Sequence, residues 1–308
     1  MSSVYSRDNT RYYLLEIERY LIMQLDRFGI AAYYLATLPL RRLAIRRAER
    51  QGLAPILVLF YHRVADTHPN GWTISRDGFA EQLEWLRQHV ELISLAEAHR
   101  RIAVGRNSKL AACITFDDGY ADNCDFALPL LLSSGVPCTY FVTTQNSLEQ
   151  KPFAHDVLAG TPVLPNTREQ IVELARDGIE IGAHTRTHCD LGRIKGSAEL
   201  YDEIAGSGDD LADWLARPIR FFAFPFGLPG NLSPSALHVA QQAGYQAVCT
   251  AYGGYNLPGQ NAFQILRFHA DPDMWRFKNW MSVDPRKYRL HRPLDWSPEP
   301  NAPSMLEV

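Results

Sequence analysis

The sequence has few cysteines, little net charge and no long apolar run, and each shortage argues against a class of protein. The five cysteines are odd in number and form no CxxC pair, so a dense disulfide framework is not indicated. A net charge of -3 gives no overall attraction to nucleic acid. We therefore expect mostly small, buried cysteine side chains and no nucleic-acid partner.

The N-terminus lacks the order of a secretory signal, which is a basic start followed by an apolar core and small residues. Glu16, Glu18 and Arg19 interrupt the first apolar stretch. The longest uncharged run, residues 28–40, contains Pro39 and is shorter than the ~20 residues of an ordinary membrane span. These features predict a cytoplasmic protein, with the inner face of the membrane as an alternative location.

Residues 1–52 differ in character from the rest of the chain. Apolar positions recur at helical spacing and are followed by the basic run RRLAIRRAER, which predicts a helical N-terminal extension. A basic amphipathic segment can lie on an anionic membrane surface, but more often it packs its apolar side on its own domain. Peripheral membrane contact through residues 1–52 stays open as one of these two interpretations.

From residue 53 onward, strand-like runs alternate with amphipathic helical patterns. The strand-like runs include APILVLFYH, AACITF, PCTYFVT, IEIGAHT and IRFFAFPFG. This alternation predicts parallel strands with helical crossovers, an α/β layer or barrel whose site lies at the carboxyl ends of the strands. We assign the main domain to residues 53–290 and a proline-rich tail to residues 291–308.

Two adjacent carboxylates end one of these strands. In ITFDDGYADN, Asp117 and Asp118 stand directly before Gly119. Consecutive side chains of a strand point to opposite faces, so the pair can serve one site only if the strand ends and the backbone turns there. Glycine permits such a turn.

A pair of histidines ends another strand. HTRTH places His184 and His188 four residues apart, which on an extended strand is about 13 Å, too far to share a metal ion. We therefore expect the chain to leave its strand at His184 and coil. A zinc-like ion needs a further ligand, which Asp117 or Asp118 can supply while the other takes a proton from water as general base. Spacing alone leaves that assignment open.

The series TFDDGY, HTRTH and FAFPFG resembles the polysaccharide deacetylase family, the carbohydrate esterases with a NodB-homology domain. LFYHRVAD upstream and AGYQAVCTA downstream follow the order of the same family, so the resemblance covers residues 55–285. It implies a distorted (β/α) barrel and a divalent metal, commonly zinc. Carried over residue by residue, it makes Asp118, His184 and His188 the ligands and Asp117 the base.

The third motif departs from the family pattern at two positions. Pro225 and Phe226 stand where the family has Pro-Tyr, and the backbone N–H after the proline is expected to help hold the oxyanion. Ala223 stands where many members carry an arginine that orients the catalytic aspartate. We hypothesise that Arg267 supplies the missing charge and keeps Asp117 ionised.

The remaining expectations concern the leaving group and the substrate groove. His269 resembles the family's late histidine, which protonates the departing amine, and Asp271 is placed to orient it. His62 is expected to line the groove. Five aromatic residues are candidate surfaces for sugar stacking, although a place in the core or in a wall is the more common one for such residues: Trp72, Tyr140, Phe224, Phe226 and Tyr252.

The reaction that the resemblance implies is hydrolysis of an N-acetyl group on an amino sugar of a polysaccharide or oligosaccharide. One alternative is an esterase that removes O-acetyl groups from a polymer such as xylan, since the same groups can cleave an ester. Another is a glycan-binding module without catalytic activity. The conjunction of a base with a ligand set argues against the binding module.

Overall fold

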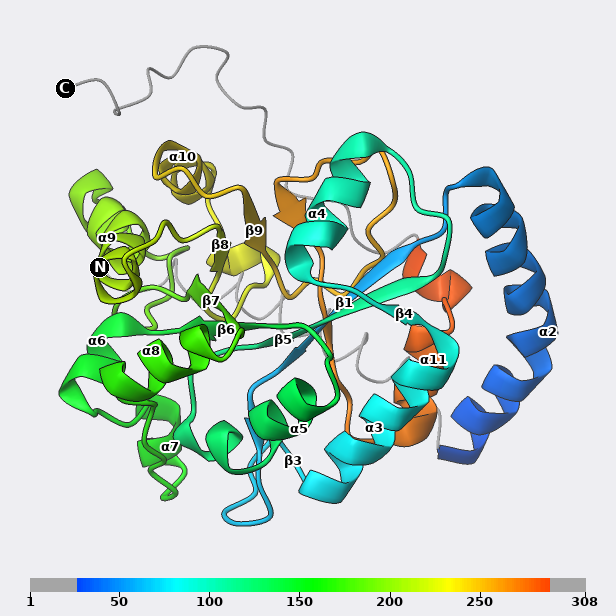
Figure 1. The fold of residues 1–308 in the computed structure, drawn as a ribbon, viewed down its shortest axis with the longest axis horizontal. Helices are drawn as coiled ribbons and strands as arrows, with labels where there is room; N and C mark the ends of the chain where they lie inside the picture. Colours follow the sequence, from blue (N-terminus) through cyan, green and yellow to red (C-terminus); the bar gives the residue numbers. More distant parts are fainter. Residues whose placement is uncertain (1–26, 289–308) are drawn as a thin grey trace, which may run out of the picture.

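The computed structural model describes residues 27–288, so residues 1–26 of the expected extension and the whole expected tail, 291–308, lie outside them. Figure 1 shows a curled sheet surrounded by helices. Every pairing in this sheet is parallel, and its strands follow one another in the order β10-β9-β8-β7-β6-β5-β1-β11, with β4 also beside β5. The predicted distorted (β/α) barrel is confirmed.

The edge strands β10 and β11 of the main sheet are short, and the longest strands, β1 and β5, are neighbours. They are β1 (Ile56–Tyr61), β4 (Glu91–Leu92), β5 (Ala111–Phe116), β6 (Cys138–Val142), β7 (Glu180–Ala183), β8 (Phe221–Ala223), β9 (Ala247–Cys249), β10 (Gln264–Ile265) and β11 (Phe268–His269). A separate parallel pair is formed by β2 (Arg63–Val64) and β3 (Thr73–Ile74).

One extended stretch, residues 264–269, draws the two edges of the sheet together. Its first half, β10, pairs with β9, and its second half, β11, pairs with β1. Asn256 supports this seam, because its side chain accepts a 2.9 Å hydrogen bond from Leu266 N–H while its backbone exchanges hydrogen bonds with Ile56. Arg267 therefore lies where the curled sheet nearly closes.

Helices cover the sheet between successive strands, as the alternating sequence pattern predicts. The α-helices are α2 (Arg27–Gln51), α3 (Arg76–His89), α4 (Leu95–Val104), α5 (Ala127–Ser133), α6 (Thr144–Glu149), α7 (Ala154–Leu158), α8 (Arg168–Arg176), α9 (Ser197–Leu215), α10 (Pro234–Gln242) and α11 (Met274–Met281), with 3-10 turns η1 (Ala121–Asp125), η2 (Pro229–Asn231) and η3 (Pro285–Tyr288). Side-chain oxygens cap several of these helices, including Ser75 before α3 and Thr167 before α8.

The core lies on both faces of the sheet. All six residues of β1 and all six of β5 are buried, which is typical of parallel strands covered on each side. Alternate residues divide between two apolar clusters: Leu57 and Leu59 pack with the surrounding helices, whereas Ile56 and Val58 pack on the other face, with α4. The five cysteines are free thiols and three of them are buried.

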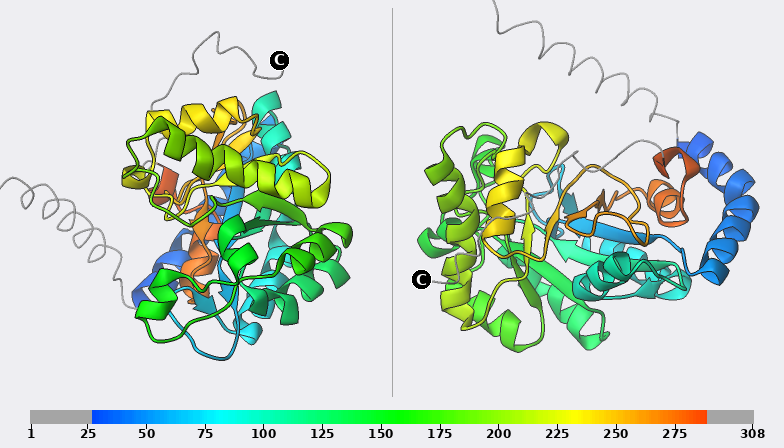
Figure 2. Two further views of the ribbon diagram at one scale, coloured as in Figure 1. Left: turned by 90° about the vertical axis from the view of Figure 1, so that its left-hand side faces the viewer. Right: turned by 90° about the horizontal axis from the view of Figure 1, so that it is seen from above.

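Helix α2 confirms that residues 27–51 of the expected extension are helical. It lies at one edge of the molecule beside α11 (Figure 2). Its buried side includes Tyr34 and Arg41, and the guanidinium of Arg41 donates to the backbone and side-chain oxygens of Asn279 at 2.8 and 2.6 Å. Among the helices of residues 27–288, none is long and apolar enough to cross a membrane.

We expect Gly182→Ala, a substitution inside β7, to destabilise the fold. A Cβ at this position would lie 2.4 Å from two ring carbons of Phe141 and 3.1 Å from the carbonyl oxygen of Phe221. Overpacking of this kind lowers the free energy of unfolding by about 1–3 kcal/mol. Urea denaturation should show a lower midpoint with an unchanged slope. Gly230→Ala is the matched control, since nothing lies within 4 Å of its added Cβ, and equal midpoints for the two variants would contradict the prediction.

Candidate active site

The carboxyl ends of several strands, among them β1, β5, β7 and β8, surround one cavity of about 480 Å³. Sites in parallel α/β folds form at these ends because the strands stop there together and the following loops meet. The cavity is lined by Phe60, His62, Trp72, Asp117, Asp118, His155, His184, His188, Phe224, Phe226, Leu228, Ala251, Arg267 and His269. Of the nine site residues predicted from the sequence, eight are in this lining, and Pro225 is outside it.

The turn expected after β5 is present. The backbone N–H of Asp117 still bonds to the carbonyl of Tyr61 at 2.9 Å, which extends the β1–β5 pairing by one residue. Asp118 and Gly119 then adopt positive φ angles of 72° and 85°. A Cβ on Gly119 would lie 3.0 Å from a methyl carbon of Val142. This turn is what lets two consecutive carboxylates line one cavity.

Three side chains bring potential metal-binding atoms together, and they form the one such group among residues 27–288. The ligand atoms of Asp118, His184 and His188 all lie within 4.8 Å of one another. Asp118 Oδ1 is 3.3 Å from Nε2 of His184 and 3.1 Å from Nε2 of His188. This oxygen is buried and has no partner with hydrogen-bond geometry. Three acceptor-type atoms converging without a shared proton fit a divalent cation.

The histidine loop is held by groups that carry no sequence signal of their own. His184 Nδ1 lies 2.7 Å from the carbonyl oxygen of Ala223, which fixes the proton on that nitrogen and leaves Nε2 free to bind a metal. The chain leaves β7 at His184 as predicted, and Thr185 Oγ1 accepts the N–H of His188 at 3.0 Å. Glu203 on α9, which the sequence analysis missed, accepts the backbone N–H of Thr187 at 3.0 Å.

The electrostatics of this group follow from burial and proximity. Burial alone would raise the pKa of the Asp118 carboxyl, but His188 and His184 outweigh that effect and hold the pKa well below its usual range. Burial would likewise lower the pKa of His188, and the charge of Asp118 more than offsets it, so this pKa is raised. The Asp118 carboxylate is therefore ionised and faces a histidine, His188, whose positive charge it favours.

Asp117 is held by a buried guanidinium. Arg267 donates from Nη1 to Oδ1 and from Nη2 to Oδ2 of Asp117, both at 2.7 Å, and both side chains are almost fully buried. Arg267 also donates to the carbonyl of Thr250 at 3.0 Å and to Thr115 Oγ1 at 3.1 Å. Burial would raise the pKa of Asp117, but the charge of Arg267 outweighs it and lowers that pKa. Arg267 thus lies in the position hypothesised for the charge missing at Ala223.

His269 and His62 form the wall next to Asp117. Burial lowers the pKa of His269 to about 4, and the neighbouring His62 adds to this effect. Trp72 packs against both rings, with centroids 4.8 Å from His62 and 5.6 Å from His269. Asp271 does not orient His269 as expected: its carboxylate accepts the N–H of Asp273 at 2.8 Å and lies 3.7 Å from Arg276.

The turn after β8 presents an aromatic side chain and a backbone donor. Phe226 has a positive φ of 60° and a half-exposed ring, and its N–H forms no hydrogen bond with any described residue. Pro225 holds this turn from behind, since its carbonyl accepts the N–H of Gly227 at 2.6 Å. Of the other four residues expected to stack on sugar, Trp72 is exposed and available for such a contact. The remaining three are buried and unsuited to stacking: Tyr140, Phe224 and Tyr252.

The fold and the cavity define a curled α/β barrel with a candidate metal centre at the carboxyl ends of its strands. A family model described as polysaccharide deacetylase matches residues 105–248, a segment that carries both aspartates and both histidines. The Bacillus subtilis protein YxkH, named as a polysaccharide deacetylase, is 26% identical over 230 residues, 74% of this chain and 75% of that protein. Residues 105–248 thus match the polysaccharide deacetylase family, the family that the motifs predicted.

Further relatives agree with this assignment. A poly-beta-1,6-N-acetyl-D-glucosamine N-deacetylase of Staphylococcus aureus is 22% identical over 249 residues, 73% of this chain and 82% of that protein. The solved structure of IcaB from Ammonifex degensii is 25% identical with a TM-score of 0.63, covering 74% of this chain and 97% of that one. The Streptococcus pyogenes deacetylase PplD shares the fold, with a TM-score of 0.61 at 21% identity over 73% of this chain and 96% of that one.

We expect Arg267→Met to lower the free energy of unfolding by about 3–5 kcal/mol at neutral pH, because it leaves the Asp117 charge buried without its partner. Chemical denaturation of the variant beside wild type measures this loss. The pKa of Asp117 is lowered in the folded protein, so the stabilisation by the pair is present above the ordinary carboxyl pKa and is lost as the pH falls through the lowered one. The difference between the two proteins should shrink accordingly in acid.

The matched control is Arg276→Met, because Arg276 is partly exposed and its ion pair with Asp271 is long, at 3.7 Å. This variant should stay within about 1 kcal/mol of wild type. A second comparison is the double variant Asp117→Asn with Arg267→Met, which removes the stranded charge and should be more stable than Arg267→Met alone. If Arg267→Met lost no more free energy of unfolding than Arg276→Met, the prediction would be contradicted.

Proposed function

We propose that this chain is a metal-dependent hydrolase that removes N-acetyl groups from amino sugars of a polysaccharide or oligosaccharide. The observation that carries the proposal is the buried Asp118 oxygen, which faces two histidine nitrogens beside an aspartate that a guanidinium holds ionised. The Staphylococcus aureus relative, named for its action on poly-beta-1,6-N-acetyl-D-glucosamine, supports an amide rather than an ester as the substrate.

We assign the metal centre to Asp118, His184 and His188, with zinc as the ion. One carboxylate and two imidazoles suit zinc, which binds nitrogen and oxygen ligands and keeps an open position in catalytic sites. When bound, the ion supplies Lewis-acid polarisation of the acetyl carbonyl.

In this proposal one residue of the chain removes a proton from water and another donates a proton to the leaving group. Asp117 takes a proton from the attacking water, and Arg267 keeps its carboxylate charged and fixed in direction. The N–H of Phe226 donates to the carbonyl oxygen as negative charge develops there. His269 gives a proton to the nitrogen of the sugar as the carbon–nitrogen bond breaks, so that acetate and a free amine result.

The aromatic walls of the cavity fit the apolar faces of a sugar ring. Trp72 lies beside His62 and His269, and Phe226 lies on the other side, next to His188 with ring centroids 5.1 Å apart. Phe and Trp rings offer large, flat apolar surfaces for such contacts. We assign Trp72 and Phe226 to sugar contact and His62 to the groove wall between the sugar and Asp117.

The test is acetate release from N-acetylglucosamine oligomers and from O-acetylated xylan. Zinc-loaded wild type should release acetate from the amino sugar, and Asp117→Asn should lower kcat by about 10²–10⁴-fold because the general base is lost. Metal content is measured for both proteins, since Asp117 is not an assigned ligand and the variant should retain its zinc.

Asp125→Asn is the control for this experiment, because it removes an exposed carboxylate just beyond the same strand and should leave turnover unchanged. Release from xylan alone would replace the N-deacetylase by an O-acetyl esterase. No release from either substrate by a zinc-containing wild type would contradict both enzymes and favour a glycan-binding module.

The role of His269 predicts a pH dependence. The pKa of His269 is about 4 because of burial, and above that value the protonated fraction falls about tenfold for each pH unit. We expect kcat/KM for an N-acetyl substrate to decrease from mildly acidic to neutral pH relative to kcat/KM for an O-acetyl ester of the same sugar, since an alkoxide leaves with less help from an acid. The ratio of the two constants is measured against pH.

His269→Ala supplies the control for that profile. Without the imidazole, amide hydrolysis should fall more than ester hydrolysis, and the ratio of the two should lose its pH dependence. A flat ratio in wild type would assign the proton donor elsewhere.

A further inference from the structure

The outward face of α2 is apolar where a surface helix is normally polar. Leu35, Leu40 and Leu43 are 56%, 71% and 61% exposed. At 100° per residue they fall on one side of the helix, opposite the side that Tyr34 buries against α11. Helical packing on the domain therefore uses one face of α2 and leaves an apolar stripe on the other.

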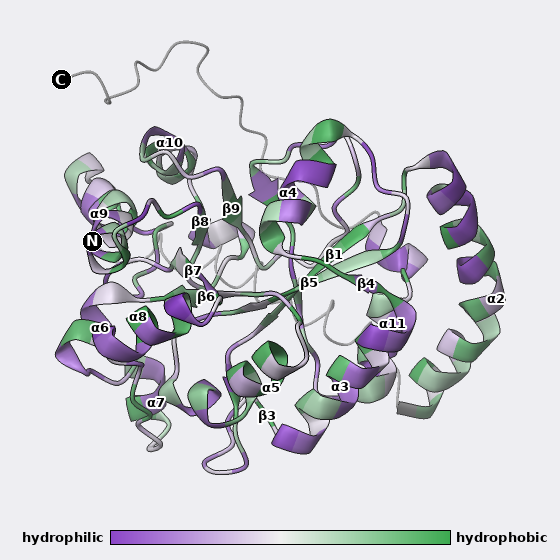
Figure 3. Ribbon diagram, in the orientation of Figure 1, coloured by the Kyte–Doolittle hydropathy of each residue, from purple (hydrophilic) through white to green (hydrophobic). Residues whose placement is uncertain are grey.

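The same outward face ends in a cluster of arginines. Arg42, Arg46, Arg47 and Arg50 are exposed, and none of them forms an ion pair with a carboxylate of residues 27–288. The one acidic residue of α2, Glu49, is turned inward and accepts the N–H of Leu110 at 3.0 Å. Figure 3 shows the two halves of the helix, apolar toward its start and hydrophilic toward its end.

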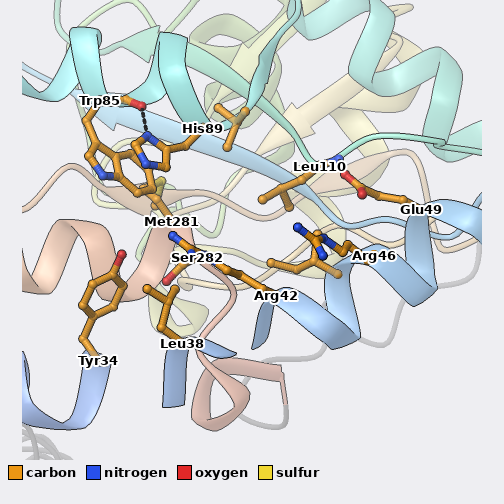
Figure 4. A pocket seen from close by; sticks show the side chains of 12 residues that line it. Tyr34, Leu38, Arg42, Arg46, Glu49, Trp85, His89, Leu110, Met281 and Ser282 are labelled. Atoms are coloured by element: carbon orange, nitrogen blue, oxygen red, sulfur yellow. Dashed lines mark hydrogen bonds between the residues drawn. The ribbon is translucent and has the colours of Figure 1, made fainter. Parts of the chain in front are cut away.

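A groove of about 220 Å³ between α2 and α3 extends this surface toward the domain. Figure 4 shows Arg42 and Arg46 on one side of it and the stacked rings of Trp85 and His89 on the other. Its remaining lining is largely apolar and includes Leu38, Ile45, Leu110 and Met281. Guanidinium groups above an apolar floor match a molecule that is anionic at one end and apolar at the other.

We propose that α2 docks on the surface of an anionic lipid membrane. Its exposed leucines enter the boundary between headgroups and acyl chains, and its four arginines bind lipid phosphates. Charge complementarity selects this partner, because a polyanion such as nucleic acid would engage the arginines but leave the apolar stripe in water. The helix leads into the amino end of β1, whereas the candidate active site lies at the carboxyl ends of the strands, so docking leaves that site accessible.

The test is co-sedimentation of the purified full-length chain with vesicles of one part phosphatidylglycerol to two parts phosphatidylcholine, beside vesicles of phosphatidylcholine alone. Wild type should pellet with the anionic vesicles and be released by added salt. Arg46→Gln with Arg47→Gln should weaken binding about fivefold per arginine, the equivalent of about 1 kcal/mol each. Leu35→Asp with Leu43→Asp should abolish the apolar contribution and release the protein from the same vesicles.

Two substitutions elsewhere on the surface serve as matched controls. Leu158→Asp on α7 and Arg217→Gln after α9 change an exposed leucine and an exposed arginine on other elements, and both should bind vesicles as wild type does. Urea midpoints of all variants should agree with wild type, because every altered side chain is exposed. This separates loss of docking from loss of folding.

Three results would overturn the proposal. Wild type that stays in the supernatant, or that pellets equally with both kinds of vesicle, has no preference for an anionic membrane. If the α2 variants bind vesicles as wild type does, any lipid contact is made by another segment. A wild type that ignores vesicles but is an oligomer, which Leu35→Asp with Leu43→Asp converts to a monomer, would make this face an interface between copies of the chain.

Discussion

The buried ion pair between Asp117 and Arg267 links the candidate catalytic base to the closure of the barrel. A charged pair removed from water is stable only if both partners are held in register and their remaining hydrogen bonds are satisfied. Arg267 meets this condition because it lies between β10 and β11, which pair with opposite edges of the sheet. The sheet must curl for the pair to form, so the geometry of the base depends on the fold as a whole.

The two neighbouring aspartates have identical side chains but different surroundings, which suit them to different roles. Both are buried, and in both the opposite charge nearby keeps the pKa low. Both carboxylate oxygens of Asp117 accept hydrogen bonds from one guanidinium, that of Arg267. Asp118 Oδ1 faces two imidazole nitrogens instead, with no hydrogen-bond geometry to either. The positive φ of Asp118 makes this possible, since a continuing strand would send one of the two away from the cavity.

Local patterns in the sequence predict the strands, the turn at Gly119 and the coil after His184, because each depends on residues close in the chain. Spacing alone leaves open which aspartate joins the histidines, and the structure places Asp118 nearer to them. Glu203 escapes prediction because it supports the histidine loop through backbone N–H groups, which have no signature in residue type. Tyr140 is buried, which is the core alternative that the sequence left open for it, since an aromatic residue on a strand can face either the core or a groove.

Helix α2 shows why the sequence left two interpretations of a basic amphipathic segment open. Packing on the domain and docking on a membrane are alternatives only if the helix has a single apolar side. Here Arg41 is buried and donates hydrogen bonds to Asn279 and Thr37, while Arg42, the next residue, is exposed. One arginine thus takes part in packing, and its neighbour in the chain stays exposed. Because helical periodicity mixes the two sets along the sequence, only the packing against α11 separates them.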